Sequence, residues 1–490
     1  MTHALPAVML FLFCFSSDAS AEKGALYAAA GKADISPNLE KETIWLAGYG
    51  ASGRRAKGVR DPLHARATVV SDGKTTVALV AVDSIGLYRE DVADIRRRLG
   101  WDGRSDRYLF VAATHDHSAP DSLGLWGRFP GVSGVNKAYH ERMKQAVADL
   151  VDDLSGRMRE ADMRAASSHL GPQGLCRDSR DPVVLDPELN VLQFKDKKGG
   201  GVIGTIVRWS CHPEALGGEN EFATADYPGA LCSLIEEKTG GACSFFSGAV
   251  GGLLGPDVKR TANVEDQFVA MKELGAKIAL AALSSLEKGG ERFSSAAVSF
   301  KTKTVRVPVE NSRYILFLRN LTFGHKIFDG EGRPLPVWKT YYYPLRHFVL
   351  FPLPESMRPW VETEASLVRI GPVKILGIPG ELFPELAIGG YQGEHAYGYP
   401  LVRPTNKNPP ALGRAPKGPY LRERMDAKHG WIVGLANDEL GYIIPEYDFK
   451  AAPTRSMTPK PEGTHYEETN STGKRVAPIL LKAYGELLGR

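Results

Sequence analysis

Apolar strand-like runs alternate with amphipathic helical stretches along the first 290 residues of the chain. The apolar run 77–82 is typical of a buried strand, and Val92, Ile95 and Leu99 follow it at helical spacing before Gly100 ends the helix. Further strands are predicted over 106–114 and 201–213, and further helices over 136–156, 226–241 and 264–290. Continuous apolar strands need cover on both faces, so we predict an α/β fold with helices on both faces of a large sheet.

The second half of the chain is richer in strands. We predict them over 296–309, 365–370, 374–381 and 431–438. The pair Gly371-Pro372 between two of these runs is typical of a hairpin turn, which makes part of the sheet antiparallel and the whole sheet mixed. No internal repeat or low-complexity linker interrupts the pattern, so we predict one large catalytic domain over residues 22–490.

Two segments break the regular pattern. The proline-rich stretch 403–420 is typical of a surface loop. The stretch 310–360 is rich in aromatic residues with interleaved basic ones, and two interpretations stay open for this insert. It is either an irregular insert that packs in the ordinary way, or a lid that touches apolar substrate or a membrane surface.

The N-terminal residues have the features of an export signal. An apolar run of about nine residues, too short to span a bilayer, is followed by Ala19, Ser20 and Ala21, an A-x-A-like cleavage site. We therefore interpret residues 1–21 as a signal peptide and expect a periplasmic or extracellular protein; the alternative is a short N-terminal helix of the fold. The composition, 43% hydrophobic and 24% charged, is that of a soluble globular protein, and the absence of a Lys/Arg block argues against nucleic-acid binding.

The cysteines leave two alternatives open. Four remain after the expected signal peptide: Cys176, Cys211, Cys232 and Cys243. In an exported chain an even number allows a disulfide, and Cys232–Cys243 is the most local pairing. Buried free thiols are the other interpretation.

The stretch FVAATHDHSAPDS, residues 110–122, places two histidines at the end of a buried strand. In an extended chain alternate side chains share a face, so His115 and His117 would project together from the carboxyl end of the strand. Two converging imidazoles suit a divalent metal ion. Asp116 would point away as a turn or supporting residue. The alternative is a pair of surface histidines in a turn.

Three more residues stand just after predicted strands. They are His212 in RWSCHP, Glu381 in IPGELF and Tyr442 in ELGYIIP. Each has an ordinary explanation, as a strand-end cap, a carboxylate at a helix N-terminus or a core tyrosine. Two or three histidines with a carboxylate are also the ligand set of a catalytic zinc site that keeps a position for water.

Taken together, these motifs resemble the neutral/alkaline, non-lysosomal ceramidases, which are zinc-dependent amidases. The matching stretches run in the family's order through nearly the whole mature chain: AAAGKADISP, LAGYG, GVRDPLHARATVVSDG, ALVAVDSIGL, THDHSAPDS, CRDSRDP, DPELNVLQF, CHPEAL, ATADYPG, IPGELF, GLANDELGYIIPEYDF and HYEETNST. The resemblance covers the family's catalytic domain only. It implies Zn²⁺ as cofactor, with His115, His212, Glu381 and Tyr442 as ligands.

The resemblance also implies catalytic roles. His117, Arg177 and Tyr466 match the groups around the bound water and the scissile carbonyl. A zinc-activated water would attack an N-acyl amide, the latter two residues would stabilise the oxyanion, and His117 would pass a proton to the leaving amine. The implied partner is a lipid-like amide, of the sphingolipid class in the family.

One loop departs from the family pattern. Where the family has G-D-[VI]-S/N-P, this chain reads SGAVGGLLGPD, with Gly252 and Leu254 in place of the two polar residues. The change puts the ceramide substrate in question and leaves the metal ligands untouched. Two alternatives to an amidase stay open: a metal-dependent lipid esterase or phosphodiester hydrolase on the same scaffold, and a non-catalytic exported binding protein.

Overall fold

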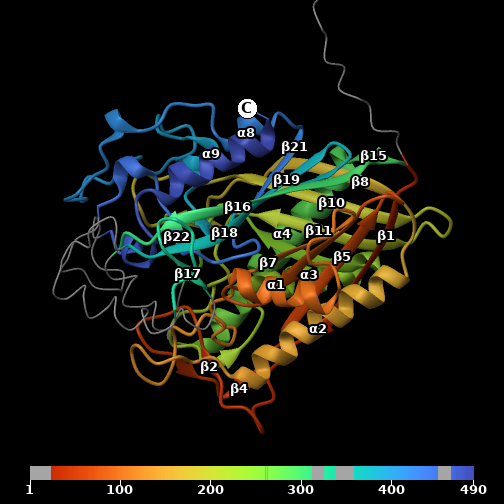
Figure 1. Ribbon diagram of the computed structural model, residues 1–490, viewed down its shortest axis with the longest axis horizontal. Helices are drawn as coiled ribbons and strands as arrows, with labels where there is room; N and C mark the ends of the chain where they lie inside the picture. Colours follow the sequence, from red (N-terminus) through yellow and green to blue (C-terminus); the bar gives the residue numbers. More distant parts are fainter. Residues whose placement is uncertain are drawn as a thin grey trace, which may run out of the picture.

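Two β-sheets stack face to face, and helices cover the outer face of each (Figure 1). The computed structural model describes residues 24–259, 261, 263–311, 325–336, 358–450 and 465–489. The expected signal peptide, residues 1–21, lies outside the described residues, as does most of the aromatic insert 310–360. Among the described helices, none combines the length and the apolar character that a membrane span requires.

The larger sheet has nine strands. Eight follow the order β13-β11-β10-β8-β1-β5-β6-β7, and β15 pairs with β8. Their bounds are β1 Tyr27–Asp34, β5 His64–Ser71, β6 Thr76–Val82, β7 Arg107–Ala113, β8 Arg159–His169, β10 Glu188–Asp196, β11 Val202–Trp209, β13 Ala242–Ser247 and β15 Glu291–Phe293. The outermost pairs, β6 with β7 and β11 with β13, are parallel, and all the others are antiparallel. The sheet is mixed, as predicted.

The smaller sheet has five strands in the order β16-β18-β19-β21, with β17 paired to β18. Their bounds are β16 Val298–Pro308, β17 Ile327–Phe328, β18 Trp360–Ile370, β19 Val373–Gly377 and β21 His429–Val433. The predicted hairpin at Gly371-Pro372 is confirmed, because β18 and β19 are antiparallel and Ile370 is opposite Val373.

Strand β6 shows why its sequence is apolar at every position. Val77, Leu79 and Ala81 face the smaller sheet, whereas Val80 and Val82 face the helices. Both faces are buried, so no position is left for a polar side chain. The predicted α/β class is confirmed, but the helices lie on the outer faces of two stacked sheets and not on both faces of one large sheet.

The helices form three groups. Helices α1 (Arg89–Arg98) and α2 (Lys137–Gly156) cover one half of the larger sheet, and α3 (Asp226–Thr239) and α4 (Val264–Gly289) cover the other half. On the outer face of the smaller sheet lie α7 (Pro384–Ile388), α8 (Leu421–Met425) and α9 (Val476–Leu488). Cys232, on α3, and the other three of the four cysteines lie as free thiols in the core that α3 and α4 cover, which is the second of the two alternatives.

Short strands and turns follow the long strands. The strand pairs are β2 (Trp45–Leu46) with β3 (Arg54–Arg55), β4 (Gly58–Val59) with β12 (Phe222–Ala223), β9 (Cys176–Asp178) with β14 (Leu254–Pro256) and β20 (Glu381–Leu382) with β22 (Tyr442–Ile443). The 3₁₀ turns are η2 Leu412–Arg414, η3 Glu446–Asp448 and η4 Glu467–Asn470. Three of the candidate site residues from the sequence lie in these short strands: Arg177, Glu381 and Tyr442.

Candidate metal centre

His115 and His117 converge, although not for the reason expected from the sequence. Strand β7 ends at Ala113, and His115 has a φ of 70°, so the backbone is left-handed rather than extended at this point. The imidazole rings nevertheless lie 5.0 Å apart, centroid to centroid. Asp116 points away from the pair and caps the turn, accepting a hydrogen bond from the backbone N–H of Ser118. The explanation from alternation along a strand is therefore wrong, and the predicted convergence is confirmed.

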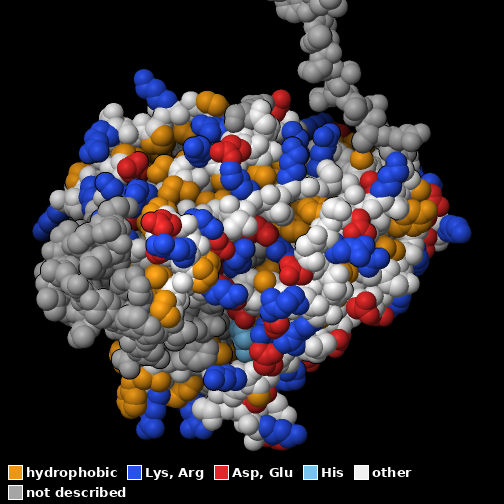
Figure 2. Space-filling view, viewed as in Figure 1, with side chains coloured by type: hydrophobic (Ala, Val, Ile, Leu, Met, Phe, Trp, Pro, Cys, Tyr) orange, Lys and Arg blue, Asp and Glu red, His pale blue; other side chains and the backbone are white. Residues whose placement is uncertain are grey.

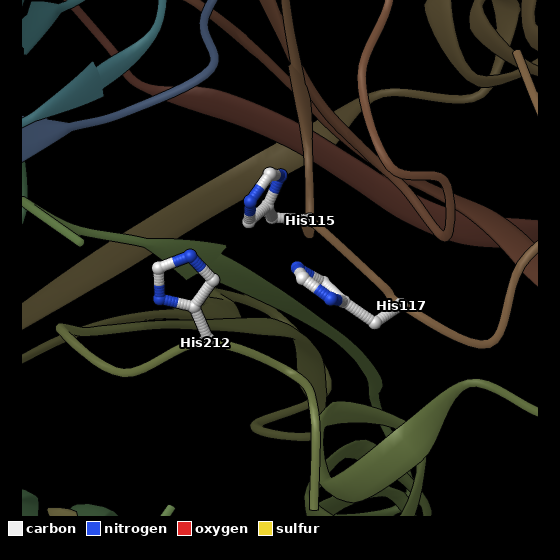
Figure 3. A group of neighbouring side chains, drawn as sticks. All are labelled: His115, His117 and His212. Atoms are coloured by element: carbon white, nitrogen blue, oxygen red, sulfur yellow. The ribbon is translucent and has the colours of Figure 1, made fainter. Parts of the chain in front are cut away.

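Three imidazoles face a common centre (Figure 3). His212, in the loop after β11, joins His115 and His117, and each ring offers one nitrogen within 4.8 Å of the others. His115 and His212 are buried and His117 is partly exposed. Three converging imidazoles are a donor set that can hold a divalent metal ion.

Backbone carbonyls fix the orientation of two of these rings. Nδ1 of His115 donates to the carbonyl of Ile85, and Nδ1 of His212 donates to the carbonyl of Leu254, each over 2.7 Å. Because a carbonyl oxygen only accepts, Nδ1 carries the proton in both rings and the Nε2 lone pairs are left to face inward. Metal-ligating histidines in proteins are held in this way.

Glu381 brings a carboxylate to the same point. Its Oε2 lies 3.0 Å from Nε2 of His212 and 3.3 Å from Nε2 of His115. Burial favours the neutral acid, but the two imidazoles outweigh this effect and hold the pKa of Glu381 at about 2. For His212, burial favours the neutral ring, yet the Glu381 carboxylate raises its pKa.

The donor set fits a metal ion. Two inward nitrogens that lie 3.0 Å and 3.3 Å from one carboxylate oxygen need a positive charge between them and that oxygen, supplied either by protons or by a cation. Zn²⁺ accepts histidine nitrogen and carboxylate oxygen together, at bond lengths of about 2.0–2.2 Å. His115, His212 and Glu381 could hold such an ion, with His117 or Tyr442 as a further ligand.

Tyr442 and Tyr466 lie beside the carboxylate. Tyr442 begins β22 directly opposite Glu381, and its hydroxyl lies 3.0 Å from the hydroxyl of Tyr466. Burial raises the pKa of both phenols, and the negative charge of Glu381 raises it further. At neutral pH each phenol keeps its proton in the absence of a metal ion, so each can donate a hydrogen bond.

A buried arginine anchors the segment that carries Tyr466. Arg180 pairs with Asp448 over 2.8 Å, with Glu467 over 3.1 Å and with Glu468 over 3.0 Å. All four side chains are buried, and two of them follow Tyr466 directly in the chain. Their mutual attraction holds the position of the tyrosine.

Arg177 makes no described contact with this group. It lies exposed on β9, opposite Gly255 of β14. Among the described residues, no hydrogen bond or ion pair of its side chain joins it to the histidines or to Glu381. The altered loop contributes through its backbone instead, because the carbonyl of Leu254 anchors His212 while the Leu254 side chain is buried in the core. Gly252 has a φ of 79°, in the left-handed region that suits glycine.

The sequence interpretation missed three residues around His117. Oε2 of Glu214 lies 3.9 Å from its Nδ1, and the ring of Tyr49 meets it edge to face at 5.2 Å. A Cβ at Gly48 would lie 2.5 Å from Cγ of His117, so only glycine allows this approach. Each residue stands in a motif quoted above, and Glu214 directly follows the Cys-His-Pro turn, but nothing in the spacing links them to His117.

Solved structures share this fold. One is described as neutral ceramidase from Pseudomonas aeruginosa, with a TM-score of 0.67 and 15% sequence identity over 95% of this chain and 74% of that chain. Another, described as ceramidase complexed with C2, gives a TM-score of 0.65 and 16% identity over 95% of this chain and 75% of that chain. No family model matches the sequence.

Proposed function

We propose that this protein is a zinc-dependent amide hydrolase that cleaves the N-acyl bond of a lipid-like substrate. The observation that carries the proposal is the convergence of Nε2 of His115, Nε2 of His212 and Oε2 of Glu381, with both Nδ1 atoms held by carbonyls. The resemblance to ceramidases and the fold shared with two ceramidase structures support the amide as the scissile bond.

His115, His212, Glu381 and Tyr442 would hold the ion. When bound, Zn²⁺ lowers the pKa of a water molecule toward about 7 and polarises a carbonyl oxygen. Glu381 would supply the anionic oxygen of the ligand set, since its Oε2 faces Nε2 of both His115 and His212. The hydrogen bonds to Ile85 and Leu254 keep the rings in the tautomer that presents Nε2.

The remaining side chains have separate tasks. Tyr466 keeps its proton at neutral pH, so its hydroxyl would donate to the oxygen of the scissile carbonyl as negative charge develops there. Arg177, exposed on β9, is assigned to the same oxygen. His117 would carry a proton to the leaving amine, with the Glu214 carboxylate 3.9 Å from its Nδ1 stabilising the charged ring.

The substrate class follows from the resemblance and from the altered loop. We propose an N-acyl lipid, with ceramide itself as one candidate, because the side chains at 252 and 254 offer no polar group to a sphingoid base. Export to the periplasm or the extracellular space, and contact of the aromatic insert with a membrane surface, are part of the same proposal.

Purified protein assayed against ceramide, N-acyl amino acids and simple lipid esters, with and without a chelator, tests the proposal. We expect amide cleavage that a chelator abolishes and added Zn²⁺ restores. Cleavage of esters or phosphodiesters alone would make it a different hydrolase. Protein that contains no zinc, and whose thermal stability a chelator leaves unchanged, would be a binding protein instead.

A further inference from the structure

An exposed apolar tip follows His115 and His117 of the candidate metal centre in the chain, beginning 12 residues after His117. Residues 126–133, here called the 126–133 loop, carry Phe129 and Val132, which are 58% and 48% exposed. The guanidinium of Arg128 lies over the Phe129 ring, 5.2 Å from its centroid. A single large apolar side chain on a protein surface is ordinary. Two at the tip of one loop, beside an arginine, suit contact with an apolar environment outside the protein.

The 126–133 loop is held rigidly in this exposed position. The buried carboxylate of Asp121 accepts backbone N–H groups from four residues, Leu123, Gly124, Trp126 and Gly134, over 2.9–3.0 Å. Within the loop, the N–H of Gly127 donates to the carbonyl of Val132 over 2.9 Å. These bonds anchor the backbone at both ends of the loop.

The same loop contacts the segment that covers His117. Gly53 donates its N–H to the carbonyl of Gly127 over 2.8 Å, and Nε1 of Trp126 donates to the carbonyl of Gly50 over 3.2 Å. Gly48 and Tyr49, which pack on His117, precede these residues in one continuous stretch of chain. The tip is thus joined to the candidate site through a single short segment.

We propose that the 126–133 loop inserts Phe129 and Val132 into a lipid surface and so holds the site next to its substrate. The charges suit a surface that contains anionic lipid, because Arg128 in the loop and Arg55, two residues after Gly53, are both exposed. Figure 2 shows hydrophobic side chains beside lysine and arginine side chains at the end of the molecule where Figure 1 places β2 and β4. An aromatic anchor with adjacent arginine is the composition of interfacial membrane segments.

Co-sedimentation with phosphatidylcholine vesicles, with and without phosphatidylglycerol, tests this inference. The double variant Phe129→Ser/Val132→Ser removes the apolar tip, and we expect its vesicle affinity to fall at least about tenfold. Val269→Ser/Leu280→Ser is the matched control, because these residues of α4 are 57% and 50% exposed and lie outside the loop. Arg128→Glu should weaken binding to the anionic vesicles more than to neutral ones.

Each outcome bears on the proposal. Equal vesicle binding by the wild-type protein and the tip variant would overturn it, as would an equal loss in the α4 control. If the tip variant instead changes the oligomeric state measured by light scattering while vesicle binding stays constant, the surface serves self-association and the lipid proposal fails.

The inference rests on the proposed function only for the identity of the substrate. The lipid-docking proposal and the hydrolase proposal can therefore fail separately. Loss of vesicle binding in the tip variant supports the docking surface even if no amide is cleaved. If the hydrolase proposal also holds, the tip variant should keep its turnover of a soluble short-chain amide and lose turnover of the same amide in vesicles. Loss of both turnovers, with vesicle binding unchanged, would contradict the docking role.

Discussion

The carboxylate of Glu381 lies 3.0 Å from Nε2 of His212, although 169 residues separate the two in the chain. His212 follows β11 of the larger sheet, and Glu381 follows β19 of the smaller sheet. The contact therefore exists only where the two stacked sheets bring their strand ends together. Packing between the sheets, more than any local motif, holds the candidate metal centre in place.

His212→Ala removes one of the two carbonyl-anchored imidazoles. We expect the variant to fold, to lose bound zinc and to lose amide turnover, because His115, Glu381 and Tyr442 would be left without the second imidazole of the ligand set. Metal analysis of purified protein and a thermal melt check both parts. His169→Ala, at an exposed position, is the control and should keep metal and activity. Activity retained in the His212 variant would contradict the ligand assignment.

His117 and Tyr442 compete for the place of the further ligand. If His117 carries the proton, His117→Ala should keep the metal and slow turnover by about 10²–10⁴-fold. Tyr442→Phe should then lower the zinc affinity, because its hydroxyl would be a ligand. The opposite result is also possible, because the three imidazoles face one another. If the His117 variant loses the metal and the Tyr442 variant keeps it, His117 is the further ligand. Zinc affinity of both variants, measured by competition with a chelator, decides between them.

Arg180→Met tests the buried charge cluster behind Tyr466. The substitution leaves Asp448, Glu467 and Glu468 without their shared cation, and breaking a buried pair in this way costs about 3–5 kcal/mol. Turnover should fall as well, because the anchored segment positions the Tyr466 hydroxyl. Urea unfolding measures the stability, and a kinetic assay at a temperature where the variant is folded measures the activity.

Arg333→Met is the matched control for this experiment. Its ion pair with Asp329 lies at the solvent-exposed surface, where such pairs contribute little to stability. An equal loss of unfolding free energy in both variants would show that the buried cluster has no special role.

His325 makes the stability depend on pH. Burial lowers its pKa, but the carboxylates of Asp438 and Glu90, 3.3 Å and 3.4 Å away, outweigh burial and raise the pKa to about 9. Because this value lies above the unfolded pKa of about 6.5, the stabilisation is complete below pH 6.5 and is lost as the pH rises through 9. The difference corresponds to about 3 kcal/mol.

Urea unfolding of the wild-type protein and of His325→Gln, measured from pH 6 to pH 9.5, checks this expectation. The wild-type protein should lose its advantage over the variant across that range. The exposed His169→Gln serves as control and should follow the wild-type curve. Parallel curves for the wild-type protein and the His325 variant would refute the assigned ion pairs.

The sequence by itself determined the local elements and the residue types of the candidate site. Apolar runs such as 77–82 and the helical spacing of Val92 and Ile95 indicate which faces of a strand or helix are buried. This pattern can be read from a few consecutive residues. The two histidines after β7 were recognisable for the same reason, because a motif and the strand before it are neighbours in the chain.

The tertiary structure alone decided what covers each face and which distant groups meet. The apolar pattern of β6 is the same whether helices or a second sheet lie above it, so the stacking of two sheets was not predictable from it. The left-handed φ of His115, the two carbonyls that fix the imidazole tautomers and the exposed position of Arg177 depend on turns whose geometry the packed elements impose. Side chains far apart in sequence meet through the packing of whole sheets, which no local pattern encodes.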